Sequence, residues 1–163
     1  MAVAHEKPML VRKYLKKGTA MIKRILVGVD FSEASKLALE RASAFAQKLA
    51  VPLVAMHVLQ PPAPMLPEAQ IALPDPDWLQ AMESHAKEQL EKLVGNLPDT
   101  VTQVVWGSPA EELVGEATSE CLLVVAQVGH SGIERLLFGS TAARVVKHAP
   151  CDVLVVRAGL KKG

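Results

Sequence analysis

The fold is decided by a short stretch near the start of the chain, residues 25–32, which reads ILVGVDFS. Its first five residues are apolar, rich in branched side chains and too few for a helix, so they predict a strand buried on both faces. Asp30 to Ser32 then supply turn residues and a helix N-cap. Apolar residues recur at helical spacing from Leu37 to Leu49. A buried strand that leads directly into an amphipathic helix is the repeating unit of an α/β protein.

The same unit recurs along the rest of the chain. Further strands are predicted at Leu53 to Val58, Val101 to Val105, Leu122 to Ala126 and Val153 to Val156, and further helices at Trp78 to Val94, from Ser108 onward, and at Ser140 to His148. Ser108, with Pro109 at N1 and Glu111 three residues after the cap, predicts a capping box. Six prolines between Gln60 and Pro76 predict a long loop. We therefore expect one doubly wound domain, an all-parallel five-stranded sheet with helices on both faces.

Composition narrows the class of protein further. The chain has 163 residues, of which half are apolar, so it is long enough for one domain with a real core. A formal net charge of +1 gives the chain no overall electrostatic attraction for nucleic acid or anionic lipid. No apolar run approaches the roughly 20 residues that span a bilayer. Two cysteines without a C-x-x-C motif argue against a disulfide scaffold or a zinc site. These features predict a cytoplasmic protein.

Residues 1–20 differ in charge from the rest of the chain. They hold five Lys or Arg and one Glu, so the rest of the chain carries a net charge of −3, and they lack the apolar core of a signal peptide. We expect a flexible basic extension, followed by a domain over residues 21–158 and a short tail over 159–163. The alternative is an electrostatic tether for RNA or for an acidic partner.

Ligands of such sheets bind at the carboxyl ends of the strands, where the strand order reverses. Asp30 follows the first strand and is predicted either to accept hydrogen bonds from a ribose or base amine, or to form an Asx-turn. Glycines after the fourth strand, followed by a helix start, predict a phosphate cradle. Its members are Gly129, His130, Ser131, Gly132, Gly139, Ser140 and Thr141. His130 has two interpretations, a contact with an anion or a solvated loop residue.

Other chemically notable side chains are interpreted as structural. His57, at the end of the second strand, is expected to be packed or hydrogen-bonded, because no nucleophile lies near it in the sequence. Cys121 and Cys151 are expected to act as small buried apolar residues. Trp78 and Trp106 are expected to be core or loop anchors, since the few aromatic residues form no cluster for stacking bases.

Several separate segments together resemble the universal stress protein family. They are ILVGVDFSEASKLALERA, the strand that ends at His57-Val58, GSPAEELVGEA and LLFGSTAARVVKHAPCDVLVVR, and the resemblance covers Ile22 to Arg157. It implies an adenine-nucleotide alpha-hydrolase-like fold with strand order 3-2-1-4-5. It also implies a homodimer through the edge strand Val153 to Val156, and binding of ATP or AMP, with Mg²⁺ accompanying ATP.

The nucleotide-binding members of this family use the pattern G-x2-G-x9-G-[ST]. By resemblance, Asp30 would meet the adenine or ribose, the backbone of Val58 the adenine, and Gly129, Gly139, Ser140 and Thr141 the phosphates. The first glycine of the pattern falls on Ala126, followed by the bulky Gln127 and Val128. An added methyl where a ligand packs closely costs about 1 to 3 kcal/mol. This departure leaves nucleotide binding open.

Three functions are consistent with the sequence. The first is a homodimer that senses or sequesters ATP or AMP and signals to an unknown protein partner. The second is a dimeric scaffold without nucleotide. The third is a slow ATPase, or a protein that phosphorylates itself at Ser131, Ser140 or Thr141. It is disfavoured because no base or carboxylate pair lies near the cradle, although Arg135 and Arg144 could turn inward. The absence of a G-x4-G-K-[ST] motif argues against a P-loop hydrolase.

Overall fold

The computed structural model describes residues 22–61, 75–127 and 139–158. The expected basic extension, most of the proline-rich loop, Gly129 to Gly132 and the tail lie outside these residues. The strands are β1 (Arg24–Gly28), β2 (Leu53–Leu59), β3 (Thr100–Trp106), β4 (Cys121–Ala126) and β5 (Asp152–Val156). The helices are α2 (Glu33–Leu49), α3 (Pro76–Val94), α4 (Pro109–Glu116) and α5 (Ser140–His148).

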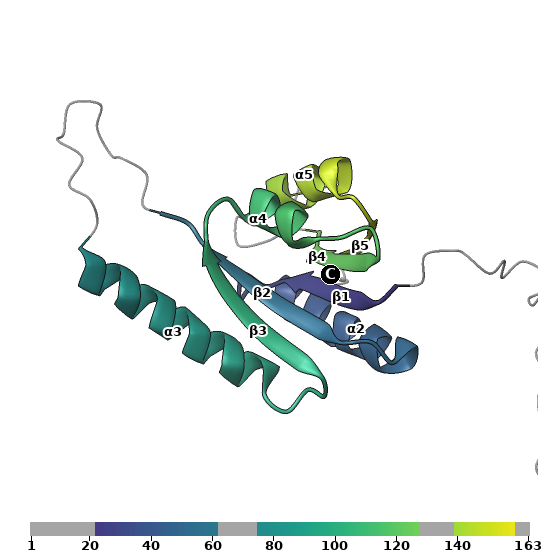
Figure 1. Ribbon diagram of the computed structural model, residues 1–163, viewed down its shortest axis with the longest axis horizontal. Helices are drawn as coiled ribbons and strands as arrows, with labels where there is room; N and C mark the ends of the chain where they lie inside the picture. The colour runs from purple at the N-terminus through teal and green to yellow at the C-terminus, as the bar shows by residue number, and fades with distance from the viewer. Residues whose placement is uncertain (1–21, 62–74, 128–138, 159–163) are drawn as a thin grey trace, which may run out of the picture.

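The strands form one parallel sheet in the order β3-β2-β1-β4-β5, which confirms the predicted fold class. Helices α2 and α3 cover one face and α4 and α5 cover the other (Figure 1). Ile25 of the central strand lies beside Leu53 of β2 and Leu122 of β4. The domain is therefore a three-layer sandwich of helices, sheet and helices. Its central strand, β1, is paired on both sides.

The core divides into two clusters, one on each face of the sheet. Ile25 and Val27 point toward α2 and α3, whereas Leu26 points toward α4 and α5, and all three are 0% exposed. Successive strand residues face opposite sides, so a strand covered on both faces needs every position to be apolar. This is why the sequence of β1 shows no polar alternation.

The helix starts follow the predictions only in part. Ser32 caps α2, and its hydroxyl accepts a hydrogen bond from the Ser35 amide at 3.2 Å. Ser108 is the N-cap of α4, but its side chain makes no capping hydrogen bond, so the predicted capping box is wrong. Its carbonyl instead accepts from the Glu112 amide at 2.9 Å. Pro76, assigned to the loop, is the first residue of α3, where a missing amide costs nothing.

The predicted apolar stripes are longer than the buried faces. In α3 only Ala86, Leu90 and Val94 are buried, while Trp78 and Met82 are 43% and 37% exposed. Of the two predicted roles of Trp78, a core or a loop anchor, its exposure excludes the first. In α2, Phe45 and Leu49 are also exposed. Helical spacing shows which face is apolar, but the length of the sheet beneath decides how much of it is covered.

The two cysteines lie beside each other at the start of β4 and just before β5. Cys121 is buried and Cys151 is half-buried, and both are free thiols. Burial raises the pKa of both thiols, so they stay protonated at neutral pH. The prediction of a small buried apolar residue is confirmed for Cys121. Among the described helices, none is long and apolar enough to cross a membrane.

Two neighbouring valines of α5 give a matched test of the core. Val145 is 0% exposed against the sheet, whereas Val146 is 52% exposed on the same helix. We expect Val145→Ala to lower the free energy of unfolding by about 1 to 3 kcal/mol, because it leaves a cavity. Val146→Ala should leave stability unchanged or slightly raised, since Ala is the better helix former. Urea denaturation followed by circular dichroism measures both, and equal effects would contradict this packing.

Candidate functional site

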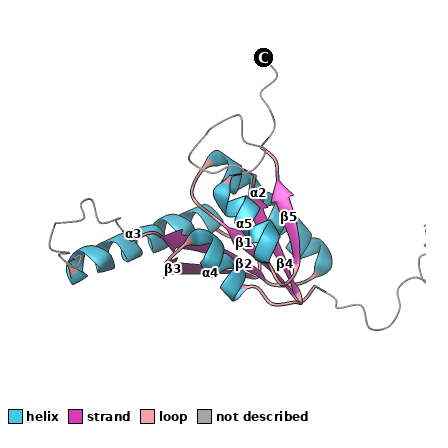
Figure 2. Ribbon diagram, turned by 90° about the horizontal axis from the view of Figure 1, so that it is seen from above, coloured by secondary structure: helices cyan, strands magenta, loops and turns pink. Residues whose placement is uncertain are grey.

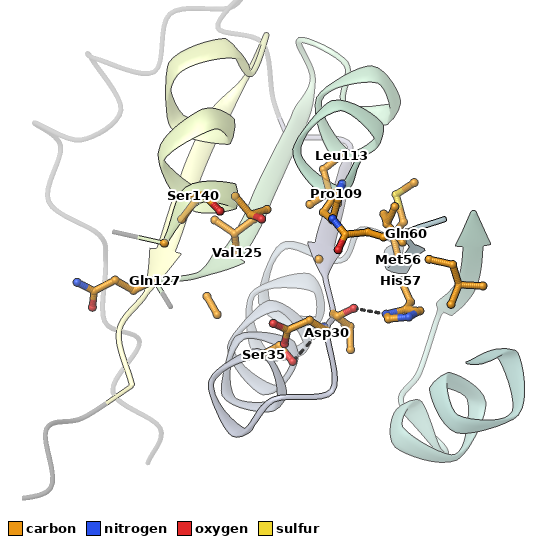
Figure 3. Close-up of a pocket in the computed structure, with 18 residues that line it drawn as sticks. Asp30, Ser35, Met56, His57, Gln60, Pro109, Leu113, Val125, Gln127 and Ser140 are labelled. Atoms are coloured by element: carbon orange, nitrogen blue, oxygen red, sulfur yellow. Dashed lines mark hydrogen bonds between the residues drawn. The ribbon is translucent and has the colours of Figure 1, made fainter. Parts of the chain in front are cut away.

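A pocket of about 480 Å³ opens at the carboxyl ends of the strands (Figure 3). It is lined from the ends of β1, β2 and β4 and from the first residues of α4 and α5. The neighbours of β1 are β2 and β4, so the pocket lies where the strand order reverses. This is the position at which open α/β sheets bind their ligands. Of the ten residues predicted for the site, six line it: Asp30, Val58, Ala126, Gly139, Ser140 and Thr141. Gly129, His130, Ser131 and Gly132 lie outside the described residues.

Asp30 lies at the end of β1, at the edge of the pocket (Figure 3). Its Oδ1 accepts hydrogen bonds from the amide and the hydroxyl of Ser32, the amide at 3.0 Å. Its own amide donates to Ser35 Oγ at 3.2 Å. Asp30 therefore makes the predicted Asx-turn, and the same turn holds the carboxylate in the pocket lining. The two predicted roles of Asp30 are compatible.

Contacts between the ends of β1 and β2 fix the neighbouring wall of the pocket. His57 Nδ1 lies 2.7 Å from the Val29 carbonyl oxygen (Figure 3). A carbonyl only accepts, so Nδ1 carries the proton and donates. The Phe31 ring packs on His57 with ring centroids 4.5 Å apart, and Phe31 has a left-handed φ of 63°. His57 is thus the structural, hydrogen-bonded residue that the sequence predicted.

The start of α5 forms the opposite wall. Gly139 is the N-cap, and its amide donates to the Gln127 carbonyl at 2.8 Å, so it is already engaged. The Gly139 amide therefore bonds within the protein, while Gly139 itself lies in the pocket lining. The first intrahelical bond runs from the Ala143 amide to the Gly139 carbonyl at 3.0 Å. Helix geometry leaves the amides of Ser140, Thr141 and Ala142 without partners inside the helix. Together with the helix dipole they make this end of the pocket attractive to an anion.

Ala126, the departure from the glycine pattern, ends β4. Its side chain packs with the cluster on the α2 face, whereas Ala142 and Val145 of α5 belong to the cluster on the other face. The methyl group therefore points away from the start of α5. The steric cost expected of Ala126 does not fall on the anion-attracting end of the pocket.

The described lining holds one carboxylate, Asp30, and no Lys or Arg. Arg144, considered as an inward clamp, instead pairs with Glu111 at 3.1 Å on the exposed surface between α4 and α5. No group of three or more His, Cys, Asp or Glu side chains in the described ranges could hold a metal ion. Backbone amides, hydroxyls and the side-chain amides of Gln60 and Gln127 are therefore the groups of this lining that could donate to an anionic ligand.

Several lining residues were not predicted for the site from the sequence, among them Gln60, Pro109 and Leu113. Leu113 lies against Gly28 of β1, where an added Cβ would come within 2.8 Å of Leu113 Cδ1. Gly28 therefore lets α4 approach the sheet and form one wall of the pocket. The glycine inside an otherwise branched strand was the available signal, because such a glycine often marks close approach of another element.

The parallel sheet, with helices on both faces and a pocket where the strand order reverses, places this chain among the doubly wound α/β proteins. The model of the universal stress protein family matches residues 21–157. A universal stress protein of Methanocaldococcus jannaschii is 28% identical over 157 residues, covering 94% of this chain and 92% of that protein. The chain belongs to the universal stress protein family.

Solved structures agree with this assignment. Universal stress protein UspA from Lactobacillus plantarum superposes with a TM-score of 0.70 at 31% identity, covering 85% of this chain and 100% of that one. A universal stress protein in complex with cAMP superposes with a TM-score of 0.56 at 27% identity, covering 85% of this chain and 99% of that one.

Two glycines test the close approach of α4. Gly28→Ala should lower the free energy of unfolding by about 1 to 3 kcal/mol, because the new methyl overlaps Leu113. Gly115→Ala in α4 is the control: nothing lies within 4 Å of its added Cβ, and it should raise stability by about 0.5 to 1 kcal/mol. Thermal unfolding distinguishes the two, and a Gly28→Ala variant as stable as the parent would contradict the packing of Leu113 on β1.

Proposed function

We propose that this protein binds an adenine nucleotide, ATP or AMP, in the pocket between β1 and β4. The observation that carries the proposal is the placement of α5: three amides without intrahelical partners begin a helix at one wall, and the Asp30 carboxylate lies in the same lining. The amides at the start of α5 suit a phosphate, and the Asp30 carboxylate suits a ribose hydroxyl or a base amine. The volume of about 480 Å³ falls in the usual range for small-ligand sites.

The remaining contacts support the same ligand. Val58 and Leu59 extend the lining along β2, where the backbone of Val58 would meet the adenine. A similar solved structure, 27% identical, is described as a complex with cAMP. With a single carboxylate in the described lining, Mg²⁺ would be held mainly by the phosphates of ATP and by water. The protein would act as a sensor or store of nucleotide that signals to a protein partner.

Isothermal titration with ATP and with AMP, each with and without Mg²⁺, tests binding directly. Ala126→Gly tests the scaffold alternative in the same experiment. Because the Ala126 methyl points away from α5, we expect the parent protein to bind and the variant to change affinity little. Binding that appears only in Ala126→Gly would make the natural protein a scaffold, and no heat from either protein would refute the proposal.

A substitution at Ser140 isolates the backbone contribution. Ser140→Pro removes one amide donor at the first position of α5, where proline is tolerated, and Gly139 already has the extended conformation that precedes proline (φ −65°, ψ 157°). Loss of a hydrogen bond to a charged phosphate should weaken affinity by about tenfold. Ser140→Ala, which keeps the amide and removes the hydroxyl, is the matched control. If both variants bind like the parent, the start of α5 is not the phosphate site.

We further propose that the protein is a homodimer through Val153 to Val156. β5 is an edge strand of the sheet, and unpaired backbone groups along an edge favour pairing with a second copy. Val155→Pro removes one donor of that edge and should yield a monomer in light scattering. Val155→Thr, which keeps the amide, should remain a dimer. A dimeric Val155→Pro protein would show that the interface lies elsewhere.

A further inference from the structure

The N-terminal half of α3 carries apolar side chains that the described domain does not cover. Every buried residue of the helix, Ala86, Leu90 and Val94, lies in its second half. Trp78 and Met82 continue the same spacing of four residues but are 43% and 37% exposed. Figure 2 shows the start of α3 projecting from the body of the domain. The apolar stripe of α3 thus runs beyond the sheet that it packs on.

Trp106, the last residue of β3, extends this exposed stripe into a surface. Its ring lies 6.4 Å from that of Trp78, measured between centroids. A groove of about 630 Å³ is lined by Trp106 together with Leu79, Glu83 and neighbouring residues of α3. We call this the Trp surface, formed by Asp75, Asp77, Trp78, Leu79, Met82, Glu83 and Trp106. Trp106 is half-buried, so Trp78 and Met82 supply the exposed apolar area beside the groove, and such an area is typical of a docking site.

The charge of the Trp surface indicates what it would bind. Residues 75–84 contain Asp75, Asp77 and Glu83 and no Lys or Arg. Lys87 at the far end of the groove is the one base in its lining. A fitting partner is therefore basic and partly apolar, with Lys or Arg side chains that pair with the carboxylates or lie over the indole rings.

Residues 7–17 of the same chain have this composition. They read KPMLVRKYLKK, with five bases, no acid and five large apolar residues. Residues 62–74, the rival occupant that precedes α3, contain Glu68 and no base, so their charge does not complement the surface.

The length of chain also suffices for docking within one molecule. Ile25 is in register with Leu53 and Thr100, six residues before Trp106. Ideal strand geometry puts Trp106 about 20 Å along the sheet and about 10 Å across it from Ile25. The residues between Leu10 and Ile25 reach up to about 50 Å when extended. We propose that residues 7–17 dock on the Trp surface of their own chain, so that the acidic partner of the basic extension is α3.

The two tryptophans of the chain, Trp78 and Trp106, both belong to the Trp surface, so tryptophan fluorescence, excited selectively over that of Tyr14, reports on this surface alone. The test compares the full-length protein with its Arg12→Glu, Lys13→Glu, Lys16→Glu variant. The variant should show a red-shifted emission and stronger quenching by acrylamide. Each reversed charge should lower the ratio of docked to undocked chains by about threefold. Added salt should shift the parent protein in the same direction, since about 1 M salt reduces the screening length to about 3 Å.

Charge reversal on the surface provides the rescue. Asp77→Lys, Glu83→Lys in the triple variant should restore the parent's emission and quenching. Glu40→Lys is the control, because Glu40 is exposed on a different helix, α2, and should rescue nothing. Leu10→Asp, Tyr14→Asp tests the apolar contribution and should also expose the tryptophans.

Three results would overturn the proposal. The first is identical emission and quenching in the parent, the triple variant and the Leu10→Asp, Tyr14→Asp variant. The second is a dependence of quenching on protein concentration, which would place the extension on a second copy. The third is exposure of the tryptophans only when residues 62–74 are replaced by a glycine-serine linker, which would make that segment the occupant.

Discussion

The pairing of β1 with β2 on one side and β4 on the other is the interaction on which the rest of the structure depends. Ile25, Leu26 and Val27 are fully buried because helices cover both faces of this strand. From β1 the chain adds β2 and β3 on one side and β4 and β5 on the other. The strand order therefore reverses between β1 and β4, and the pocket opens at the carboxyl ends of these strands. One buried strand therefore organises the core and also places the candidate site.

The chemistry of the pocket follows from this position. The described walls offer helix amides, hydroxyls, the side-chain amides of Gln60 and Gln127 and one carboxylate, but no Lys or Arg. Amides at a helix start are held by the backbone and lose little freedom when they meet an anion. Phe31 adopts a left-handed φ in the turn after β1, where it packs on His57. A bulky residue at positive φ is strained, and the contact with His57 helps to hold Phe31 in this conformation.

The sequence predicted the elements well because their signals are local. Strand ends agree with the structure to within one residue, and α5 agrees at both ends. The features that the sequence left open or missed have a common physical cause. The lost Ser108 capping bond, the exposure of Trp78 and the engagement of the Gly139 amide all depend on neighbours distant in sequence or on backbone details. The site prediction found six lining residues through motif position, but Gln60, Pro109 and Leu113 join the pocket only because separate elements converge there.

By itself, the sequence determined the alternation of buried strands with amphipathic helices, and hence the parallel sheet and the end of it at which a ligand would bind. It also determined a basic segment joined to a mildly acidic domain. Only the tertiary structure decided which face the Ala126 methyl takes, which amides at α5 are engaged, and how far α3 extends past the sheet. Local patterns fix the period of each element, whereas these outcomes depend on how distant elements meet.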